Sequence, residues 1–357
     1  MFNGARILVA PLDWGLGHGT RCVPIIRRLL ALGARPVVGA DRGPLAMLRG
    51  EFPELEWARI PGVDVHYSRG RSQFWSMLSQ MPAMVRSVKE EQELFLKLHE
   101  VRRFDAVISD QRFGIRTAEV PSVIITHQVF PFTPFAQGLL RRLNIKQIER
   151  FDRCWVADEA EAPGLAGELS HGAPMPANAR YIGPMSRFAP DDVHAPEDRY
   201  DVVAVISGPE PQRTVLEKAL MDQLSELRGR HLLVLGQPEK LEDRWVGYLR
   251  RVSHMKADAL RDALIGARLI VSRTGYTTLM DLAILGRSAL VVPTPGQAEQ
   301  EYLGRLHRSS GRFVVQDQRH VDVAAVLAAP PAAPKPATPG HDLLEQALQE
   351  LATRLPR

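Results

Sequence analysis

The feature that most constrains the fold is a repeated alternation of short, continuously apolar runs with stretches of helical spacing. Arg6–Leu12 and Arg35–Ala40 are apolar runs, and Cys22–Leu32 between them has helical spacing and ends at Gly33. Strands that are apolar at every position are typical of a parallel sheet with helices on both faces. Further runs of this kind lie at 55–60, 106–109, 122–126, 153–157, 180–182, 201–206, 231–235, 268–271 and 288–292. The sequence therefore predicts an α/β protein of doubly wound parallel sheets.

A proline-rich, charged stretch interrupts this alternation at 183–199, which is typical of an interdomain linker. The length of 357 residues also favours two domains. Two Rossmann-like domains joined by one linker would face each other across a cleft, with the carboxyl ends of both sheets lining it. We expect an N-terminal domain at 1–183, a linker at 184–199, a C-terminal domain at 200–327, a Pro/Ala-rich tether at 328–340 and a docked helix at 341–357. Ser72–His99 is predicted to be helical, with a break at Pro82.

Composition narrows the classes of partner. The net charge is +4, with arginines spread along the chain, and aromatic residues make up 6%. This balance fits a small anionic ligand or an anionic membrane surface better than nucleic acid. Two cysteines, Cys22 and Cys154, make no disulfide framework, and no Cys/His spacing is typical of zinc. We therefore expect no metal and no cofactor. Without a visible signal sequence or membrane span, we expect a cytoplasmic protein.

The first candidate site is Gly15-Leu16-Gly17-His18-Gly19-Thr20-Arg21, between the first strand and the first helix. Glycines allow a sharp turn and close approach of a ligand, and a helix N-terminus attracts anions. His18 either reaches a substrate from this turn or only caps the helix. Arg21 is expected to be solvated or ion-paired.

Two similar stretches follow strands of the second half. Ser207 and Gly208 open a turn that either cradles phosphate or is simply rigid, since Pro209 and Pro211 remove amide donors. The third stretch combines a Thr/Gly-rich helix start with a later PTPG loop, and it suits a diphosphate and sugar hydroxyls. Its candidate residues are Arg273, Thr274, Gly275, Thr277, Asp281, Gln300 and Glu301.

The third stretch, SRTGYTTLMDLAILGRSALVVPTPGQAEQEYLGRL, resembles the donor-binding half of GT-B glycosyltransferases. It is most similar to glycosyltransferase family 28, which contains the lipid-linked N-acetylglucosaminyltransferase of peptidoglycan synthesis. The N-terminal GLGHGTRCVPIIRRLLALG resembles the glycine-rich loop of that family, whose histidine lies in the cleft. Together with the linker, the resemblance spans most of the chain.

The resemblance implies roles for residues at matching positions. Thr274, Gly275 and Thr277 would contact the donor phosphates, and Ser207 and Gly208 match the first loop of the C-terminal domain. Asp281 stands where the family has a ribose-binding glutamate, and its shorter side chain leaves that contact open. Gln300 and Glu301 match paired glutamines near the sugar, and the PEP sequence after Gly208 departs from the family pattern.

This resemblance implies an inverting transferase that moves a sugar from a nucleotide-diphosphate donor, expected to be UDP-linked, to an acceptor hydroxyl. His18 would be the base, and Arg273 or Arg187 would offset charge on the diphosphate. The acceptor would be a lipid or a small secondary metabolite. A nucleotide-sugar 2-epimerase, using Asp13, Asp110 or Glu210, and a non-catalytic binding protein of the same shape remain alternatives.

The acceptor side is less defined by sequence. Gly17, Asp13, Asp110 and His127 are candidates because they follow strands of the first domain, although they could equally be polar loop tips. Phe74–Val88 is rich in Met and aromatic residues beside Arg69, Arg71, Arg86 and Lys89. This stretch fits contact with an anionic membrane, such as the inner face of the plasma membrane, or ordinary core packing.

Overall fold

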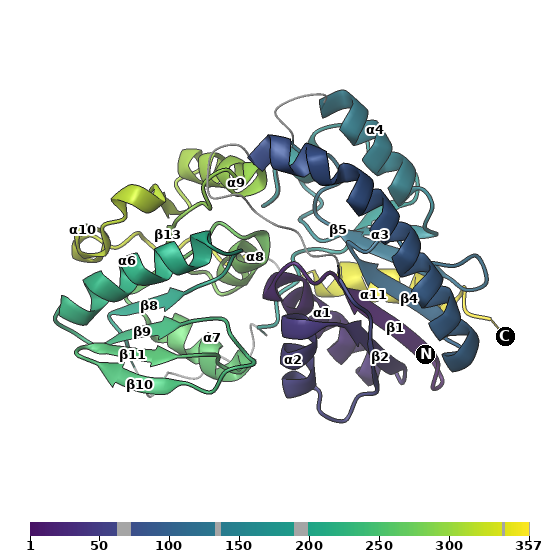
Figure 1. Ribbon diagram of the computed structural model, residues 1–357, viewed down its shortest axis with the longest axis horizontal. Coiled ribbons are helices and arrows are strands. Elements are labelled where there is room, and N and C mark those ends of the chain that lie inside the picture. Colours follow the sequence, from purple (N-terminus) through teal and green to yellow (C-terminus); the bar gives the residue numbers. More distant parts are fainter. Residues whose placement is uncertain (63–72, 133–136, 189–198, 338–339, 357) are drawn as a thin grey trace.

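The computed structural model describes residues 1–357 apart from 63–72, 133–136, 189–198, 338–339 and 357, and without the side chains of 73–85 and 341. Two α/β domains lie side by side, the N-terminal one running from purple through blue to teal and the C-terminal one mainly green in Figure 1. Each is built on one seven-stranded sheet. The protein therefore has the predicted architecture of two doubly wound, Rossmann-like domains.

The N-terminal sheet has the order β3-β2-β1-β4-β5-β6-β7, and all its neighbouring strands are parallel. Its strands are β1 (Arg6–Pro11), β2 (Arg35–Ala40), β3 (Trp57–Arg59), β4 (Ala106–Asp110), β5 (Ser122–Thr126), β6 (Arg153–Val156) and β7 (Ala179–Tyr181). Its helices are α1 (Leu16–Ala31), α2 (Arg42–Glu51), α3 (Gln73–Arg102), α4 (Gln137–Ile148) and α5 (Glu168–His171). The predicted break in α3 is wrong, because one helix continues through Pro82.

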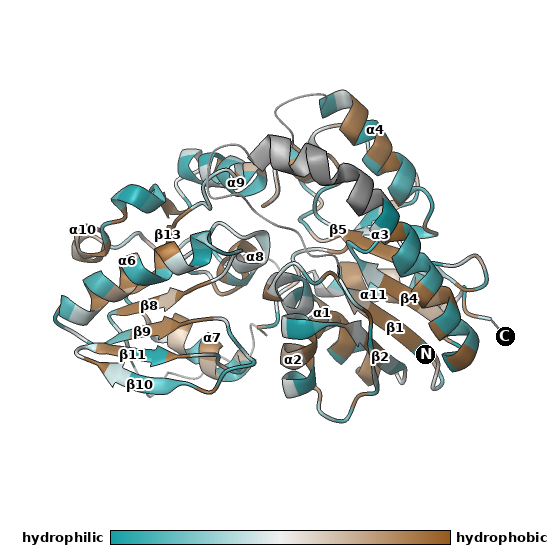
Figure 2. Cartoon of the chain, in the orientation of Figure 1, coloured by the Kyte–Doolittle hydropathy of each residue, from teal (hydrophilic) through white to brown (hydrophobic). Residues whose placement is uncertain are grey.

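The C-terminal sheet has the order β10-β11-β9-β8-β12-β13-β14 and is parallel except for the edge strand β10. Its strands are β8 (Val202–Val205), β9 (His231–Val234), β10 (Asp243–Val246), β11 (Leu249–Val252), β12 (Leu269–Ser272), β13 (Leu290–Val291) and β14 (Val314–Val315). Its helices are α6 (Gln212–Glu226), α7 (Ala257–Gly266), α8 (Tyr276–Ile284), α9 (Ala298–Ser309), η1 (Gln318–His320) and α10 (Val323–Ala328). The inner strands are brown in Figure 2 and β10 is pale or teal, as expected for an exposed edge.

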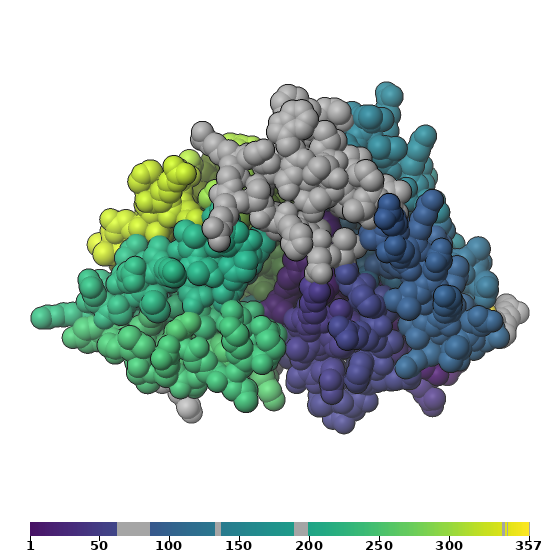
Figure 3. Space-filling view, in the orientation of Figure 1, coloured from purple at the N-terminus to yellow at the C-terminus, as the bar shows by residue number. Residues whose placement is uncertain are grey.

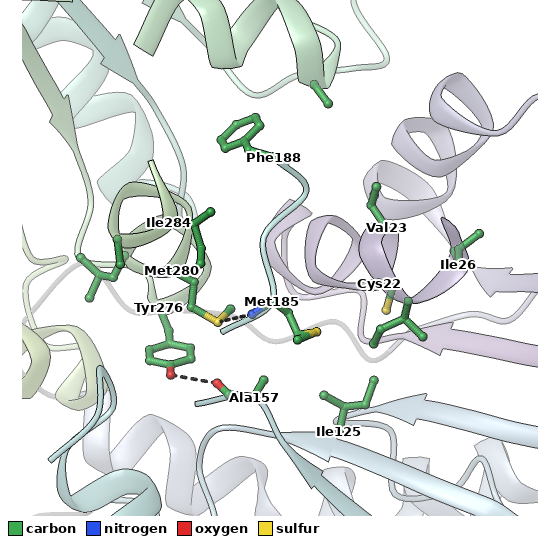
Figure 4. Packing of buried hydrophobic residues seen from close by; sticks show 14 of the residues in the cluster. Cys22, Val23, Ile26, Ile125, Ala157, Met185, Phe188, Tyr276, Met280 and Ile284 are labelled. Carbon is green, nitrogen blue, oxygen red and sulfur yellow. Dashed lines mark hydrogen bonds between the residues drawn. The ribbon is translucent and has the colours of Figure 1, made fainter. Parts of the chain in front are cut away.

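Both faces of each sheet are covered, which explains the unbroken apolar strands. On β1, Ile7 packs in the same core cluster as Ile25 of α1, whereas Leu8 faces Phe95 of α3. On β8, Val203 belongs to the first cluster and Val202 packs with Leu216 of α6. The first cluster runs through both domains, so the two sheets share one continuous core (Figure 4).

The C-terminal chain returns to the N-terminal domain. Helix α11 (His341–Ala352) buries Leu344, Leu348 and Leu351 in the shared core. Glu345 and Glu350 of α11 pair with arginines of α1 and β6. The last helix therefore packs against the first domain rather than extending into solvent.

Several sequence expectations fall wholly or partly outside the described residues. Arg69 and Arg71 belong to 63–72, and most side chains of 74–88 are not described. Most of the expected linker lies at 189–198. None of the helices in the described part of the chain has the length and apolar character needed to cross a bilayer.

Candidate active site

The two domains meet at the beginnings of two helices, α1 and α8. The hydroxyl of Thr277 on α8 donates a hydrogen bond to the carbonyl oxygen of Gly17 on α1 at 3.1 Å. Neither helix start is capped by a side chain in the described structure. Two sets of uncapped N–H groups therefore lie close together where the two domains meet. Figure 3 shows the surface of the molecule, which is hollowed between the green C-terminal domain and the purple part of the N-terminal domain.

Helix α1 begins earlier than its sequence pattern predicts, at Leu16 rather than near Cys22. The turn is made at Gly15, whose φ of 115° is unfavourable for other residues. Gly17 and Gly19 are inside the helix, where they allow close packing: a Cβ on Gly19 would lie 2.7 Å from Cε of Met47. His18 is therefore held on a rigid first helical turn and not on a loop.

His18 lies beside a buried ion pair. Its Nδ1 is 3.3 Å from Oδ2 of Asp110, which ends β4, and 2.9 Å from Nη2 of Arg21. Arg21 Nε donates to the same Asp110 oxygen at 2.6 Å, and Arg21 Nη2 donates to the other. Burial alone would raise the pKa of Asp110, but the charges of Arg21 and His18 hold it below its ordinary value. Asp110 is thus an ionised partner of His18 rather than an exposed loop tip.

His127, which follows β5, is enclosed by the domain interface. Its Nδ1 lies 2.9 Å from Arg21 Nη1, its Nε2 lies 2.8 Å from Oε1 of Glu299, and its ring stacks on Tyr276 at 4.1 Å. Burial lowers the pKa of His127 from its ordinary value despite the Glu299 contact. Both ring nitrogens are engaged within the protein, and the expectation that His127 lines an acceptor pocket stays a prediction.

Glu299 is the residue that sequence reasoning missed. It lies in the first turn of α9, directly before Gln300 and Glu301, the two residues that match the family's paired glutamines. Although burial opposes ionisation, the hydrogen bond with His127 lowers the pKa of Glu299 from its ordinary value. An acidic residue in a first helical turn normally compensates the helix dipole, so nothing in the sequence pointed to the opposite domain.

On the C-terminal side, Ser207 and Gly208 lie directly after β8. Gly208 has a φ of 102°, and a Cβ built on it would lie 3.6 Å from Oγ1 of Thr294. The Thr294 hydroxyl is buried and makes no hydrogen bond within the described residues. A polar atom therefore faces the glycine, an arrangement that suits a hydrogen-bonding ligand.

Arg273 is hydrogen-bonded within the C-terminal domain. It is fully buried, and its guanidinium donates to the backbone oxygens of Val292, Pro293 and Gln212 and to the side chain of Gln318. Burial lowers its pKa to about 10. Arg273 thus ties the strand ends of the C-terminal domain together through its two Nη atoms. Its buried Nε has no hydrogen-bond partner among the described residues and lies 3.9 Å from the position of a Cβ on Gly208, so a contact with the donor stays a prediction.

The expected sugar-contacting residues hold the loop before α9. Thr274 Oγ1 donates to the Gln300 backbone oxygen at 2.9 Å, and Gln300 Oε1 accepts from the Thr294 amide at 2.9 Å. Glu301 Oε1 accepts from the Gly296 amide at 2.7 Å. These hydrogen bonds fix the shape of the PTPG loop, so Thr274 and Gln300 position the loop through their contacts with its backbone and with each other.

Asp281 lies against the linker. It accepts a hydrogen bond from Ser186 at 2.6 Å, and its other oxygen is 3.8 Å from Nε of Arg187. Burial raises the pKa of Asp281 to about 6. The expected ribose contact is therefore replaced, in this structure, by a contact between α8 and the segment joining the domains.

Two further candidates, Asp13 and Glu210, have these neighbours. Asp13 is packed against Gly62, on which a Cβ would come within 2.6 Å of the Asp13 Cβ. Glu210, proposed for an epimerase, is largely exposed and pairs with Arg213. The described residues contain no cluster of three or more His, Cys, Asp or Glu side chains suited to a metal ion.

Comparison with known proteins identifies the fold. No family profile and no curated protein matches the sequence. Among solved structures, the spinosyn rhamnosyltransferase SpnG complexed with thymidine diphosphate is 17% identical, with a TM-score of 0.60 over 99% of this chain and 97% of its own. The spinosyn forosaminyltransferase SpnP is 15% identical, with a TM-score of 0.59 over 98% and 99%. SnogD from Streptomyces nogalater, a glycosyltransferase, is 16% identical, with a TM-score of 0.58 over 99% and 97%. The chain has the GT-B fold.

Proposed function

We propose that this protein is a glycosyltransferase that moves a sugar from a nucleoside-diphosphate donor to an acceptor hydroxyl. The observation that carries the proposal is the position of His18. It stands on the first turn of α1, beside the buried Asp110 carboxylate and where the start of α8 meets the start of α1. A basic imidazole next to two anion-binding helix starts suits a reaction in which a proton is removed as a diphosphate departs.

In the proposed reaction, the acceptor oxygen attacks the anomeric carbon and the bond from that carbon to the diphosphate breaks. The diphosphate leaves with the electron pair, and the acceptor proton passes to Nε2 of His18. Asp110 stabilises the resulting imidazolium through Nδ1. A single displacement of this kind inverts the anomeric centre.

The diphosphate would lie between Gly208 and the start of α8. N–H groups at the uncapped α8 start and the Thr294 hydroxyl beside Gly208 are suited to its oxygens. Both helix dipoles would stabilise the charge that develops on the leaving group. Thr277, which now bonds Gly17, lies at the same place and would contact the phosphates.

The proposed donor carries a pyrimidine base, and the proposed acceptor is a small secondary metabolite. The family resemblance favours uridine, whereas the SpnG complex contains thymidine diphosphate. Thermal-shift measurements with UDP, TDP, ADP and GDP separate these cases, because a ligand that binds the folded state raises its apparent stability. We expect UDP or TDP to raise the melting temperature most. Equal, negligible shifts with all four would contradict nucleotide binding.

The first prediction concerns His18→Ala. Loss of a general base typically lowers the rate by about 10²- to 10⁴-fold. We expect kcat for sugar transfer to fall by this factor while the thermal shift with the preferred nucleotide is retained. Hydrolysis of the donor, measured in parallel, is the control. Unchanged kcat would exclude His18 as the base, and donor binding without transfer in the wild type would favour the binding-protein alternative.

A further inference from the structure

Arg21 is a buried side chain at the domain interface that makes several hydrogen bonds. It is 1% exposed and lies on α1, one turn after His18. Its guanidinium reaches Asp110, His18 and His127 at the same time. The proposed reaction gives Arg21 no role, although Arg21 contacts both the base His18 and its partner Asp110.

An arginine side chain only donates hydrogen bonds, so any imidazole nitrogen that bonds it must be unprotonated. Nδ1 of His127 lies 2.9 Å from Arg21 Nη1 and therefore accepts. The proton of neutral His127 is then on Nε2, where it is donated to Glu299 at 2.8 Å. One tautomer satisfies both contacts.

His18 faces two incompatible neighbours at Nδ1. Arg21 Nη2 requires this nitrogen to accept, and Asp110 Oδ2 requires it to donate. The distance to Arg21 is 2.9 Å and that to Asp110 is 3.3 Å, so the contact with Arg21 is the closer one. The arrangement favours neutral His18 with its proton on Nε2.

That tautomer cannot accept a proton at Nε2. We propose that Arg21 is a positioning residue that sets the tautomer of His18 and keeps the base in a resting form until Arg21 leaves Nδ1. On activation, His18 loses the Nε2 proton to solvent and takes up one proton from solvent at Nδ1, which then donates a hydrogen bond to Asp110. The charge of the ring is unchanged, and Nε2 becomes free to take the acceptor proton. This role for Arg21 rests on the proposed function of His18.

The same arginine connects the base to the donor-side domain. Its Nη1 bonds His127, which is held by Glu299 of α9 and stacked on Tyr276 of α8. Tyr276 in turn donates to the Ala157 backbone oxygen at 2.8 Å, as Figure 4 shows. A movement of the C-terminal domain that shifts His127 would therefore also shift Arg21 relative to His18.

Nitrogen-15 NMR of protein labelled in histidine tests this role directly, because it reports which ring nitrogen carries the proton. In the wild type we expect the ring proton of both His18 and His127 to be on Nε2. In Arg21→Gln, the proton of His18 should move to Nδ1 as Asp110 becomes its sole charged partner there. Arg21→Lys, which keeps one positive charge beside Asp110 but lacks the planar fork, should shift His18 in the same direction.

Arg28→Gln is the matched control, since Arg28 lies on the same helix but pairs with Glu345 of α11. It should leave both tautomers unchanged. His18 protonated at Nδ1 in the wild type would overturn the proposal, even if both Arg21 variants failed to fold. An unchanged His18 tautomer in a folded Arg21 variant would overturn it too. Absence of sugar transfer by the wild type would instead count against the proposed function, because the NMR result does not depend on turnover.

Discussion

Asp281 shows how burial gives a single carboxyl group a measurable effect on stability. It is 5% exposed, and its pKa is raised to about 6 by burial, from an ordinary value of 3.8. Arg187 at 3.8 Å and the Ser186 hydroxyl offset only part of this effect. A carboxyl group with a raised pKa favours the folded state when protonated, and that stabilisation is lost as the pH rises from 3.8 through 6.

Asp281→Asn should therefore stabilise the protein at pH 8. A shift of this size corresponds to about 3 kcal/mol in unfolding free energy, and the asparagine oxygen can still accept from Ser186. Chemical denaturation at pH 8 and at pH 4 measures the difference, which should be near zero at pH 4. An asparagine variant that is no more stable than the wild type at pH 8 would show that Arg187 neutralises the carboxylate fully.

Residues that share one sequence motif can have side chains that point in different directions. His18 and Thr277 lie at the domain junction, and both follow strands in the sequence. Arg273 and Gln300 share the same motif but point into the C-terminal domain. A motif places residues along the backbone, whereas the direction of each side chain depends on which neighbours supply hydrogen-bond partners.

At the scale of elements, helix starts that contain glycine determine how closely the domains approach. A Cβ built on Gly17 would lie 3.1 Å from Thr277 Oγ1, which is closer than ordinary van der Waals contact. By contrast, a Cβ on Gly50 of α2 meets nothing within 4 Å. The first glycine is explained by cross-domain packing, and the second has no such constraint.

This difference predicts that alanine substitutions at Gly50 and Gly17 will change the unfolding free energy differently. Gly50→Ala should raise the unfolding free energy by about 0.5–1 kcal/mol, because alanine favours a helix over glycine. Gly17→Ala should lose that gain, since its methyl group must displace the Thr277 side chain. Denaturant midpoints of the two variants give the comparison. An equal stabilisation by both would mean that the contact between α1 and α8 adapts without cost.

The strands β10 and β11 were not predicted, because neither forms a continuous apolar run in the sequence. β10 and β11 are short and rich in arginine, and β10 is an exposed edge strand held to β11 by contacts such as Arg250 with Asp243. Their pairing depends on cross-strand neighbours rather than on alternating apolar residues. The buried strands were predictable because each is apolar along its whole length.

At the scale of the whole molecule, α9 joins the two domains outside the active-site network. His307 Nε2 lies 3.0 Å from the Leu165 backbone oxygen, and Tyr302 Oη accepts from the Glu168 amide at 2.8 Å. Burial lowers the pKa of His307 to about 4, although the Leu165 contact opposes the shift. Protonation of His307 therefore disfavours the folded state.

The sign of the resulting pH dependence follows from this lowered pKa. The unfolded chain binds a proton at His307 below pH 6.5, whereas the folded one does so only below about 4. Stability from this group is complete above 6.5 and is lost as the pH falls towards 4, by about 2–3 kcal/mol at pH 4.5. His307→Gln, which retains an N–H donor but does not titrate, should flatten this part of the profile. Identical profiles from pH 7.5 to 4.5 for the variant and the wild type would contradict the assignment.

The sequence by itself determined most of the buried strands, because full burial in a parallel sheet favours apolar residues at successive positions. It also determined the start of α1 at the domain junction, because glycine suits the φ of 115° at Gly15 and the close approach of Thr277 to Gly17. The tertiary structure alone decided which charged groups meet: Asp110, Arg21, His127 and Glu299 are far apart in the chain and belong to both domains. Hydrogen-bond partnership between such groups depends on distances of about 3 Å, which only the packing of one domain on the other sets.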